Sequence, residues 1–409
     1  MRALTVEAST RAALDRLAGG LPSIGIALSG GGDSVALLHI TARWAGPRRV
    51  MAATVDHGLR AEAAGEAKAA GRAAQALGIA HETLEWRGHR SGNLMANARA
   101  ARAALLADWA ARHGLAAVVL GHTRDDLAET LMMRLARGAG VDGLAAMDEA
   151  RTGHGTLWLR PMLAVGRDAL RDWLRGQGIP WVDDPSNENP DYDRARIRAA
   201  IAGLRLPTQA LADSAAHLRQ AREALSWAAA RVCSDARIVA GSVRLDLARF
   251  TESPAEIRRR ILIAALRFFA GPGYPPRRSQ TDHALNALMA GGRATLAGMI
   301  LTPDGDRLCI IREPAAAARA TPLSADGIWD NRWHISGLRA TETVSALGYD
   351  GLTGFDWRAA GLARDEAAAT PAIRQGAEII AAPALVAHPR LGAKPLRGAD
   401  DFRDMFFAH

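Results

Sequence analysis

Short apolar segments alternate with helical segments through the first third of the chain, and no other feature restricts the fold as strongly. The apolar segments cover 23–28, 50–55, 82–86 and 116–120, and helices are expected from about 34, over 61–77 and 95–113, and from about 124. Strands that are apolar on both faces are typical of a parallel sheet covered by helices on each side. We therefore predict a doubly wound, mostly parallel α/β fold whose ligands bind at the carboxyl ends of the strands.

The pattern changes after residue 205. Helices are expected over 207–232, 254–270 and 277–290, strands over 294–301 and 307–312 with turn residues at 303–305 between them, and a Pro/Ala-rich linker over 313–323. We therefore expect a helical region after the α/β fold, and then a small mixed domain. The predicted domain boundaries are 1–205, 206–315 and 316–409.

The basic residues are almost all arginine. Lys and Arg together number 51 against 43 Asp and Glu, and Lys68 and Lys394 are the only lysines. Such a bias is typical of a high-GC genome, and it also suits phosphate or nucleic acid, because the guanidinium group is planar and always charged. Composition alone does not separate these two interpretations.

The two cysteines, Cys233 and Cys309, exclude several classes of protein. Without a CxxC pair, a structural zinc site or a dithiol redox centre is not expected, and neither is a disulfide scaffold. No apolar run reaches the roughly 18–20 residues that a membrane span needs, and the N-terminus does not have the pattern of a signal peptide. We therefore expect a cytoplasmic protein.

The strongest local signal is Ser29-Gly30-Gly31-Gly32-Asp33-Ser34, between a predicted strand and a predicted helix. Glycines allow a tight turn and a close approach to an anion, and the start of the helix offers free N–H groups. The hydroxyls of Ser29 and Ser34 can donate to phosphate oxygens, and Asp33 can hold Mg²⁺. The stretch fits neither the GxxxxGK[ST] nor the GxGxxG pattern. A plain glycine turn is the alternative.

Two further motifs end predicted strands. The second, 55–60, places Val55 and His57 where backbone groups can meet adenine and the imidazole can contact a phosphate, although Asp56 and Gly58 also suit an ordinary turn. The third begins at Gly121 and contains the polar residues His122, Asp125, Asp126 and Glu129. Carboxylates three and four positions apart share a helix face. Such a group can bind a cationic substrate or act as a base for an amine, whereas capping of the helix explains only one Asp.

Arginine-rich motifs follow in a fixed order. They are Arg134–Leu144, Arg160–Leu163 with Arg167 after it, Asp183–Asn187, and Arg194–Arg198. The glycine-rich stretch resembles the PP-loop of N-type ATP pyrophosphatases, whose fold is Rossmann-like. The whole series over 24–203 resembles the tRNA(Ile)-lysidine synthetase family, and 291–298 and 328–333 are similar to segments of its C-terminal region. Leu127 and Ala195 depart from the residues common in the family, Gln and Asn.

This resemblance implies an activity and its substrates. The family uses ATP to adenylate the wobble cytidine of an isoleucine tRNA with a CAU anticodon, releasing pyrophosphate, and then attaches lysine at C2 with release of AMP. The ATP site would comprise Ser29 to Ser34, Val55, His57 and Gly121, with Mg²⁺ on Asp33. The candidate catalytic residues are Asp33, His122, Asp125, Asp126 and Glu129, and the arginines that could hold the tRNA are Arg99, Arg137, Arg194, Arg196 and Arg198. Free L-lysine is the second substrate, and a homodimer is one alternative for the assembly.

Three other classes are weighed against this hypothesis. A ligase of the same superfamily could act on a small molecule, but an amidating enzyme would need an ammonia source, and no nucleophilic Cys lies near the N-terminus. A thiolating tRNA enzyme would need cysteines in the first domain. A non-catalytic RNA-binding module would not need the intact acidic residues of the first and third motifs.

Overall fold

The structure is a computed structural model that describes residues 5–58, 63–86, 94–182, 191–271, 273 and 275–407. The chain divides into two compact units, Met1–Arg222 and Glu223–His409. The three-part division expected from the sequence stays a prediction.

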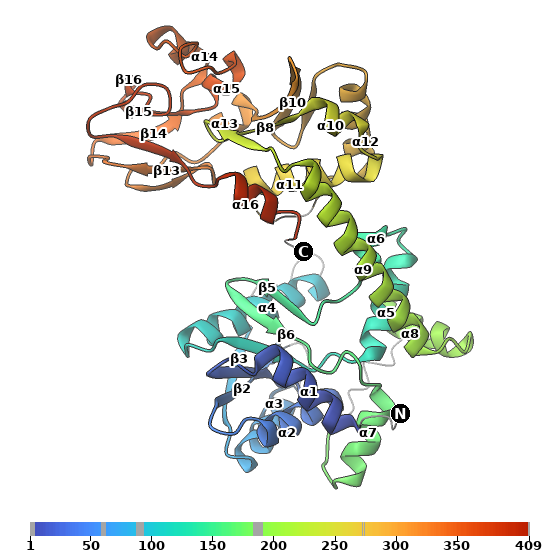
Figure 1. Cartoon of the computed structure of the whole chain (residues 1–409). Coiled ribbons are helices and arrows are strands. Elements are labelled where there is room, and N and C mark those ends of the chain that lie inside the picture. The colour runs from blue at the N-terminus through green and yellow to red at the C-terminus, as the bar shows by residue number, and fades with distance from the viewer. Residues whose placement is uncertain are drawn as a thin grey trace. The chain divides into compact units, whose positions relative to one another are not determined.

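The first unit contains one sheet and the helices around it (Figure 1). Its strands are β1 (Ser23–Ala27), β2 (Arg49–Asp56), β3 (Ala80–Glu85), β4 (Ala117–Leu120), β5 (Ala150–Gly153) and β6 (Thr156–Leu159). Its helices are α1 (Val6–Ala18), α2 (Gly32–Trp44), α3 (Ala63–Ala76), α4 (Leu94–Arg112), α5 (Arg124–Leu135), α6 (Val141–Leu144), α7 (Arg167–Gly176) and α8 (Asp193–Gly203). Helix α9 (Thr208–Val232) crosses the boundary between the units.

The sheet has the order β3-β2-β1-β4-β6-β5. All neighbours pair in parallel except β5 and β6. The strand order reverses direction at β1, because the chain proceeds to β2 on one side and later to β4 on the other. The predicted doubly wound fold is therefore confirmed, and the ends of β1 and β4 flank the point where ligands bind in such sheets.

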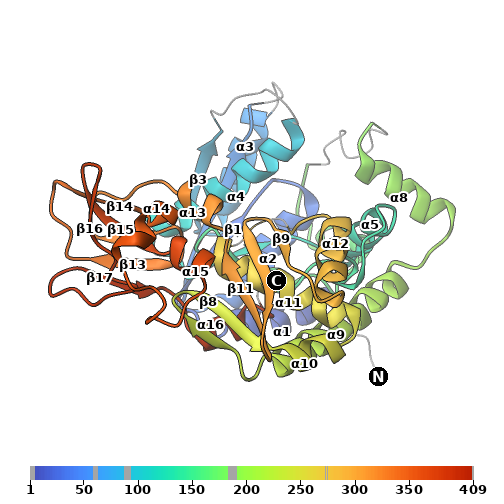
Figure 2. The same cartoon turned by 90° about the horizontal axis from the view of Figure 1, so that it is seen from above.

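Helices cover both faces of this sheet (Figure 2), as alternate side chains of the strands require. Ile24 and Ile26 of β1 belong to the apolar cluster that contains residues of α1, α2, α3 and α7. Ala27, on the opposite face of the same strand, belongs to the cluster of α4, which includes Trp109. β1 is buried throughout, so the loop that follows it is attached to a strand at the centre of the core.

Gly25 leaves no room for a side chain. A Cβ atom there would lie 2.4 Å from Cζ3 of the fully buried Trp109, a ring held inside the sheet–helix core. We expect Gly25→Ala to lower the free energy of unfolding by about 3 kcal/mol, because an overpacked core must distort. Gly20→Ala is the matched control, since a Cβ at Gly20 meets nothing within 4 Å. Urea unfolding of both variants measures the difference, and equal stability of the two would contradict this packing.

The second unit is built from three small sheets. Its strands are β7 (Arg237–Val239), β8 (Ser242–Asp246), β9 (Ala294–Leu296), β10 (Met299–Asp304), β11 (Arg307–Arg312), β12 (Gly327–Trp329), β13 (Trp333–Ser336), β14 (Glu342–Ala346), β15 (Pro371–Gln375), β16 (Glu378–Ala381) and β17 (Gly392–Pro395). Its helices are α10 (Leu247–Glu252), α11 (Ala255–Ala270), α12 (Arg278–Met289), α13 (Pro314–Ala318), α14 (Gly348–Gly351), η2 (Leu352–Gly354), α15 (Arg364–Ala368) and α16 (Ala399–Asp404). The sheet orders are β7-β8-β11-β10-β9, β12-β13-β17 and β14-β15-β16.

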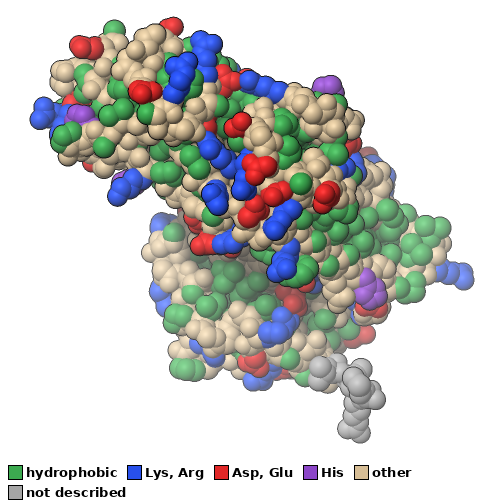
Figure 3. All heavy atoms as spheres, turned by 45° about the horizontal axis from the view of Figure 1, so that its top comes forward, with side chains coloured by type: hydrophobic (Ala, Val, Ile, Leu, Met, Phe, Trp, Pro, Cys, Tyr) green, Lys and Arg blue, Asp and Glu red, His purple; other side chains and the backbone are tan. Residues whose placement is uncertain are grey.

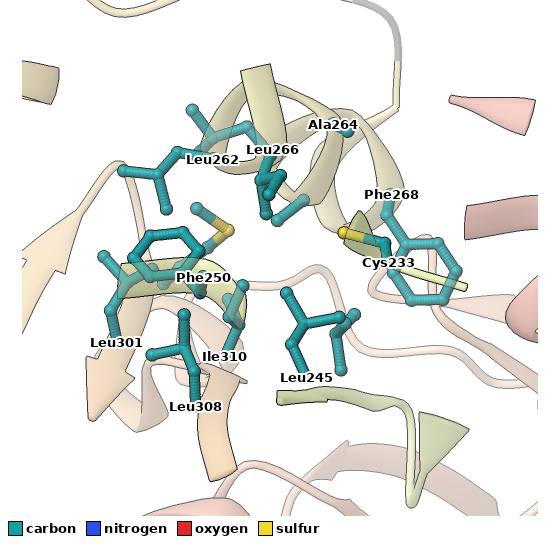
Figure 4. Packing of buried hydrophobic residues seen from close by; sticks show 14 of the residues in the cluster. Cys233, Leu245, Phe250, Leu262, Ala264, Leu266, Phe268, Leu301, Leu308 and Ile310 are labelled. Carbon is teal, nitrogen blue, oxygen red and sulfur yellow. The ribbon is translucent and has the colours of Figure 1, made fainter. Parts of the chain in front are cut away.

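The largest core of this unit lies between α11 and the five-stranded sheet. Figure 4 shows Leu262 and Leu266 of α11 over Leu301 and Ile310 of β10 and β11. The last helix of the chain, α16, adds Phe402 to the same cluster. A second cluster contains residues of β12 to β16. The helices α9, α11 and α12 thus match the predicted ones within one residue at each end.

Two expectations for this unit were wrong. Residues 294–301 form a hairpin of β9 and β10 rather than one strand, because Ala297 and Gly298 both have positive φ angles and turn the chain. The predicted linker instead contains helix α13, which starts with Pro314 at its first position and buries Ala316 and Ala317. Small apolar residues favour a loop only where they are exposed, and here Ala317 packs in the apolar cluster of β12 to β16.

Charged side chains of both signs are intermingled on the face shown in Figure 3. Many arginines form ion pairs, for example Arg16 with Glu149 and Arg112 with Glu82, both at 2.8 Å. Among the residues that the structure describes, no helix is long and apolar enough to cross a membrane.

Candidate active site

The glycine-rich stretch forms a tight loop between β1 and α2. Gly30 has a φ angle of +86°, which favours glycine, and Gly31 caps the start of α2. The Ser34 hydroxyl donates to the Gly31 carbonyl (2.9 Å) and accepts from the Ser29 backbone N–H and hydroxyl (both 3.1 Å). These bonds fix the loop around the start of the helix, where free N–H groups can bind phosphate. We call Ser29 to Ser34 the phosphate loop.

The end of β4 lies directly against the phosphate loop. A Cβ atom at Gly121 would come within 3.2 Å of backbone atoms of Asp33 and of Ser34 Cα, so only glycine allows this approach without displacement. On another side of the loop, the Val182 N–H donates to the Gly30 carbonyl (3.2 Å), and the Trp181 ring lies against Gly32. The first and third sequence motifs therefore meet at one edge of the sheet, as predicted.

Asp126 is the third residue of helix α5, and its side chain is part of the cap at the start of that helix. Its Oδ2 accepts from the Thr123 N–H (2.7 Å) and hydroxyl (3.0 Å), while the Asp126 N–H donates to the Thr123 hydroxyl. This capping box accounts for one oxygen of one carboxylate. The other oxygen of Asp126 and the carboxylates of Asp125 and Glu129 face other partners, so capping alone does not explain the group. We call Asp125, Asp126 and Glu129 the acidic cluster.

Arg167 connects the acidic cluster to the phosphate loop. Its backbone N–H donates to Asp125 Oδ2 (2.7 Å). Its guanidinium donates from Nε to Asp33 (3.3 Å), from Nη1 to Glu129 (3.1 Å) and from Nη2 to Asp126 (2.9 Å). Burial, with the nearby charge of Asp126, raises the pKa of Asp33 to about 6 even though Arg167 lowers it. Asp33 is therefore the carboxylate of the site that an additional cation would stabilise most.

Arg194 and Arg198 of α8 also bind the acidic cluster. Arg194 donates to Glu129 Oε2 (2.6 Å) and to Asp126 Oδ1 (2.9 Å), and Arg198 donates to Glu129 Oε1 (2.9 Å). Burial alone would raise the pKa values of Asp126 and Glu129, but these arginines and Arg167 lower them below the usual range. Both carboxylates are thus ionised at neutral pH and are poor proton acceptors.

His122 stands beside the cluster as a neutral imidazole. Its Nδ1 accepts from Nε of Arg160 (3.2 Å), which in turn donates from Nη1 to the Asp148 carbonyl (2.7 Å). Burial lowers the pKa of His122 to about 3; Asp126 opposes this, and the charges of Arg160 and Arg102 add to it. An imidazole held this way can accept or donate a hydrogen bond without carrying charge.

The neutral state of His122 predicts an acid-sensitive fold. A folded-state pKa near 3, below the unfolded value of 6.5, means that its contribution to stability is lost as pH falls from 6.5 towards 3. Between pH 7 and pH 5 we expect the wild type to lose about 2 kcal/mol more than His122→Gln, whose amide oxygen can still accept from Arg160. Urea midpoints at the two pH values measure this. Equal losses in both proteins would contradict the assignment.

The end of β2 contributes an aromatic and basic corner. His57 lies edge-on to Trp86, with ring centroids 6.2 Å apart, and its Nδ1 is buried without a hydrogen-bond partner in the described structure. Burial, and then the charge of Arg102, lowers the pKa of His57. The positive charge of Arg102 also acts on His122, so this arginine of α4 lies near both histidines. Val55, half-buried, precedes this corner in β2.

The other predicted tRNA arginines lie at or near the surface. Arg137 donates to Asp193 Oδ2 (2.9 Å), Arg196 pairs with the same carboxylate, and Arg99 of α4 is exposed. Leu59, Arg60 and the motif Asp183–Asn187 lie outside the described residues. Leu127, the first departure from the family pattern, is buried in an apolar cluster with Leu131 and Leu163, which explains an apolar residue there. Nothing in the structure explains Ala195.

Arg160, Arg167 and Arg102 were not predicted as site residues. A signal for Arg167 was present: it follows Gly166 at the first position of a helix, where the helix dipole disfavours a cation unless carboxylates lie nearby. No comparable signal pointed to Arg102, because its place depends on how α4 packs on the sheet. The structure brings together Asp33, Gly121, His122, the acidic cluster, Arg194 and Arg198.

The fold, with a phosphate loop after β1 and polar residues after β4, defines the PP-loop class of ATP-using domains, and a family model described as a PP-loop domain matches residues 6–204. Similar proteins are the tRNA(Ile)-lysidine synthases of Ruegeria pomeroyi (43% identical, covering 94% of this chain and 94% of that protein), Hyphomonas neptunium (35%, 77% and 91%) and Zymomonas mobilis (38%, 68% and 84%). The chain belongs to the tRNA(Ile)-lysidine synthase family.

Proposed function

We propose that the protein uses ATP to attach lysine to C2 of the wobble cytidine in an isoleucine tRNA with a CAU anticodon. The change would let that tRNA read AUA instead of AUG. The observation that carries the proposal is the contact between the phosphate loop and the acidic cluster through Arg167, in a chain that is 43% identical to a tRNA(Ile)-lysidine synthase. An enzyme that handles both RNA and free lysine would work in the cytoplasm.

In the first step, O2 of the cytosine attacks the α-phosphate of ATP and pyrophosphate leaves. The phosphate loop supplies the fixed backbone N–H groups and hydroxyls that this departure requires. The end of β2, with Val55 and His57, is the proposed place of the adenosine and its phosphate. Among the described residues Nδ1 of the neutral His57 has no partner, which leaves it capacity for one hydrogen bond to the nucleotide.

The donor set fits Mg²⁺ brought by ATP. Within the described residues, no group of three or more His, Cys, Asp or Glu could hold a metal ion by itself. Mg²⁺ commonly takes one or two carboxylates and completes its shell with phosphate oxygens and water. Asp33, beside the loop and with a pKa raised by burial, is the proposed protein ligand. The bound ion would neutralise charge on the departing pyrophosphate.

In the second step, the ε-amine of lysine, in its neutral form, attacks C2; the bond from C2 to the adenylated oxygen breaks, AMP leaves, and the added nitrogen gives up a proton to solvent. Because Asp126 and Glu129 are ionised and poor bases, we assign them to holding the ammonium group of lysine rather than to accepting its proton. Their arginine partners differ in exposure: the side chains of Arg194 and Arg198 are 34% and 37% exposed, against 14% for Arg167. Lysine would therefore displace the two arginines of α8.

The displaced arginines would then bind the RNA. Arg194 and Arg198, freed from the carboxylates, can pair with phosphates of the anticodon loop, together with Arg137, Arg196 and Arg99. A base of such a loop is already partly unstacked, so moving it into the site costs little. This exchange of partners would explain why Arg194 and Arg198 contact the acidic cluster and are also among the arginines expected to bind the RNA.

A direct assay tests the function. The protein is incubated with ATP, Mg²⁺, labelled lysine and a tRNA(Ile) transcript with a CAU anticodon, and the RNA is digested to nucleosides. We expect label in a modified cytidine, one pyrophosphate for each lysine, and no label in a transcript whose wobble base is U. Incorporation of lysine into neither RNA, or ATP cleavage driven by a small acceptor alone, would contradict the proposal.

A further inference from the structure

Arg167 contacts every carboxylate of the site that the described residues define. It lies at the start of α7, and four of its hydrogen bonds reach Asp33 on α2 and all three members of the acidic cluster on α5. Its side chain is only 14% exposed. Carboxylates of two helices, α2 and α5, therefore bind one guanidinium that a third helix, α7, supplies. Neither step of the proposed reaction assigns a role to this group.

The shape of the guanidinium makes this contact a geometric constraint. Its N–H donors lie in one plane at fixed angles, so three carboxylates bound to three different nitrogens are fixed relative to one another. Here Nε binds the carboxylate of the phosphate loop, and Nη1 and Nη2 bind Glu129 and Asp126. A lysine side chain in place of Arg167 has all its donors on one nitrogen, so it cannot hold Asp33, Glu129 and Asp126 at the same separations.

The charges support the same conclusion. Asp33 and Asp126 repel each other, since the charge of Asp126 raises the pKa of Asp33. Burial would lower the pKa of Arg167, but the carboxylates of Asp126, Glu129 and Asp33 raise it above the ordinary value, so the guanidinium keeps its charge. Arg194 and Arg198 add further bonds to Asp126 and Glu129, and Arg167 is the residue that joins this pair to Asp33.

We propose that Arg167 is a positioning residue that holds Asp33 of the phosphate loop at a fixed separation from Asp126 and Glu129, so that the adenylated base and the lysine amine are aligned for transfer. This inference rests on the proposed function. It means that Arg167 matters most for the transfer of lysine to a base that is already activated. A displacement of about 1 Å between reacting groups can cost about 10²-fold in rate.

Single-turnover reactions, with enzyme in excess over tRNA, test the proposal by measuring pyrophosphate and lysidine in the same samples. We expect the wild type to form one lysidine per pyrophosphate with no lag. In Arg167→Lys, pyrophosphate should appear first and lysidine should follow at least roughly tenfold more slowly. A variant that is merely less well folded would lower both products by the same factor. Equal loss of both, or an unchanged ratio, would overturn the proposal.

Two further measurements make the result specific. Arg112→Gln is the matched control. It breaks a 2.8 Å bond to Glu82 at the end of α4, away from the candidate site. Its ratio of lysidine to pyrophosphate should equal that of the wild type. Guanidinium chloride, far below denaturing concentration, should restore the ratio of lysidine to pyrophosphate in Arg167→Ala to the wild-type value. Methylammonium chloride should not. Equal effects of the two salts would also overturn the proposal. A wild type that forms neither product would instead contradict the proposed function.

Discussion

Asp33→Asn should abolish pyrophosphate release while making the folded protein more stable. An asparagine still accepts a hydrogen bond from Arg167, but its neutral amide is a much weaker ligand than a carboxylate for the Mg²⁺ that would neutralise the departing pyrophosphate. We expect the rate of tRNA-dependent pyrophosphate release to fall by at least about 10²–10³-fold. The same replacement removes a buried carboxylate whose ionised form is costly.

The sign of the stability change follows from the pKa of Asp33. Its folded value of about 6 lies above the unfolded value of 3.8, so the favourable contribution is present below pH 3.8 and is lost as pH rises through 6. At pH 8 we expect Asp33→Asn to exceed the wild type by about 1–2 kcal/mol in free energy of unfolding, and the two curves to converge towards pH 4. Urea unfolding against pH measures this, with the exposed Asp108→Asn as control. A destabilised Asp33→Asn at pH 8 would contradict the assigned pKa.

Asp126→Asn should impair lysine use far more than ATP use. The amide oxygen can still accept from Thr123 and preserve the helix cap, whereas the negative charge that attracts an ammonium group is lost. We expect the KM for lysine to rise by about 10²-fold, in line with the loss of about 2–3 kcal/mol for a charged hydrogen bond. Pyrophosphate release without lysine should change by less than about tenfold.

The measurement is a pair of titrations on the same preparation. Lysine is varied in the complete reaction, and ATP is varied in pyrophosphate release without lysine, with Asp108→Asn again as the control. Glu129→Gln should behave like Asp126→Asn, because the two carboxylates share Arg167 and Arg194. An Asp126 variant that loses ATP binding and keeps its lysine KM would show that this carboxylate belongs to the nucleotide site.

The sequence predicted the sheet and its loops well for a physical reason. In β1 and β4, runs of apolar residues buried on both faces leave few alternatives to a central parallel strand, and glycine or a capping residue marks where each one ends. The adjacency of Asp33 and the acidic cluster then follows, because β1 and β4 are neighbours in the sheet. Two strands of the sheet were missed. Residues 150–153 of the antiparallel β5 are mostly exposed and have no apolar pattern, and the buried β6 is only four residues long.

The arginine network could not be predicted in the same way. Arg167, Arg194 and Arg198 come from segments 38 to 69 residues away from Glu129, and their convergence depends on how α7 and α8 pack against α5. Periodicity identifies the buried face of a helix but does not say which distant carboxylate a long side chain will reach. The predicted group of carboxylates is present, and arginines from α7 and α8 already compensate its charges.

The central claim is that ATP activates a base of the RNA and that lysine then displaces AMP in the same site. Transfer of label from [α-³²P]ATP tests this most directly, with tRNA(Ile) and Mg²⁺ present and lysine left out. We predict that the label becomes attached to the wobble cytidine and that added lysine releases it as AMP while lysidine forms in equal amount. Label that is found on lysine, or that never enters the RNA, would contradict the account.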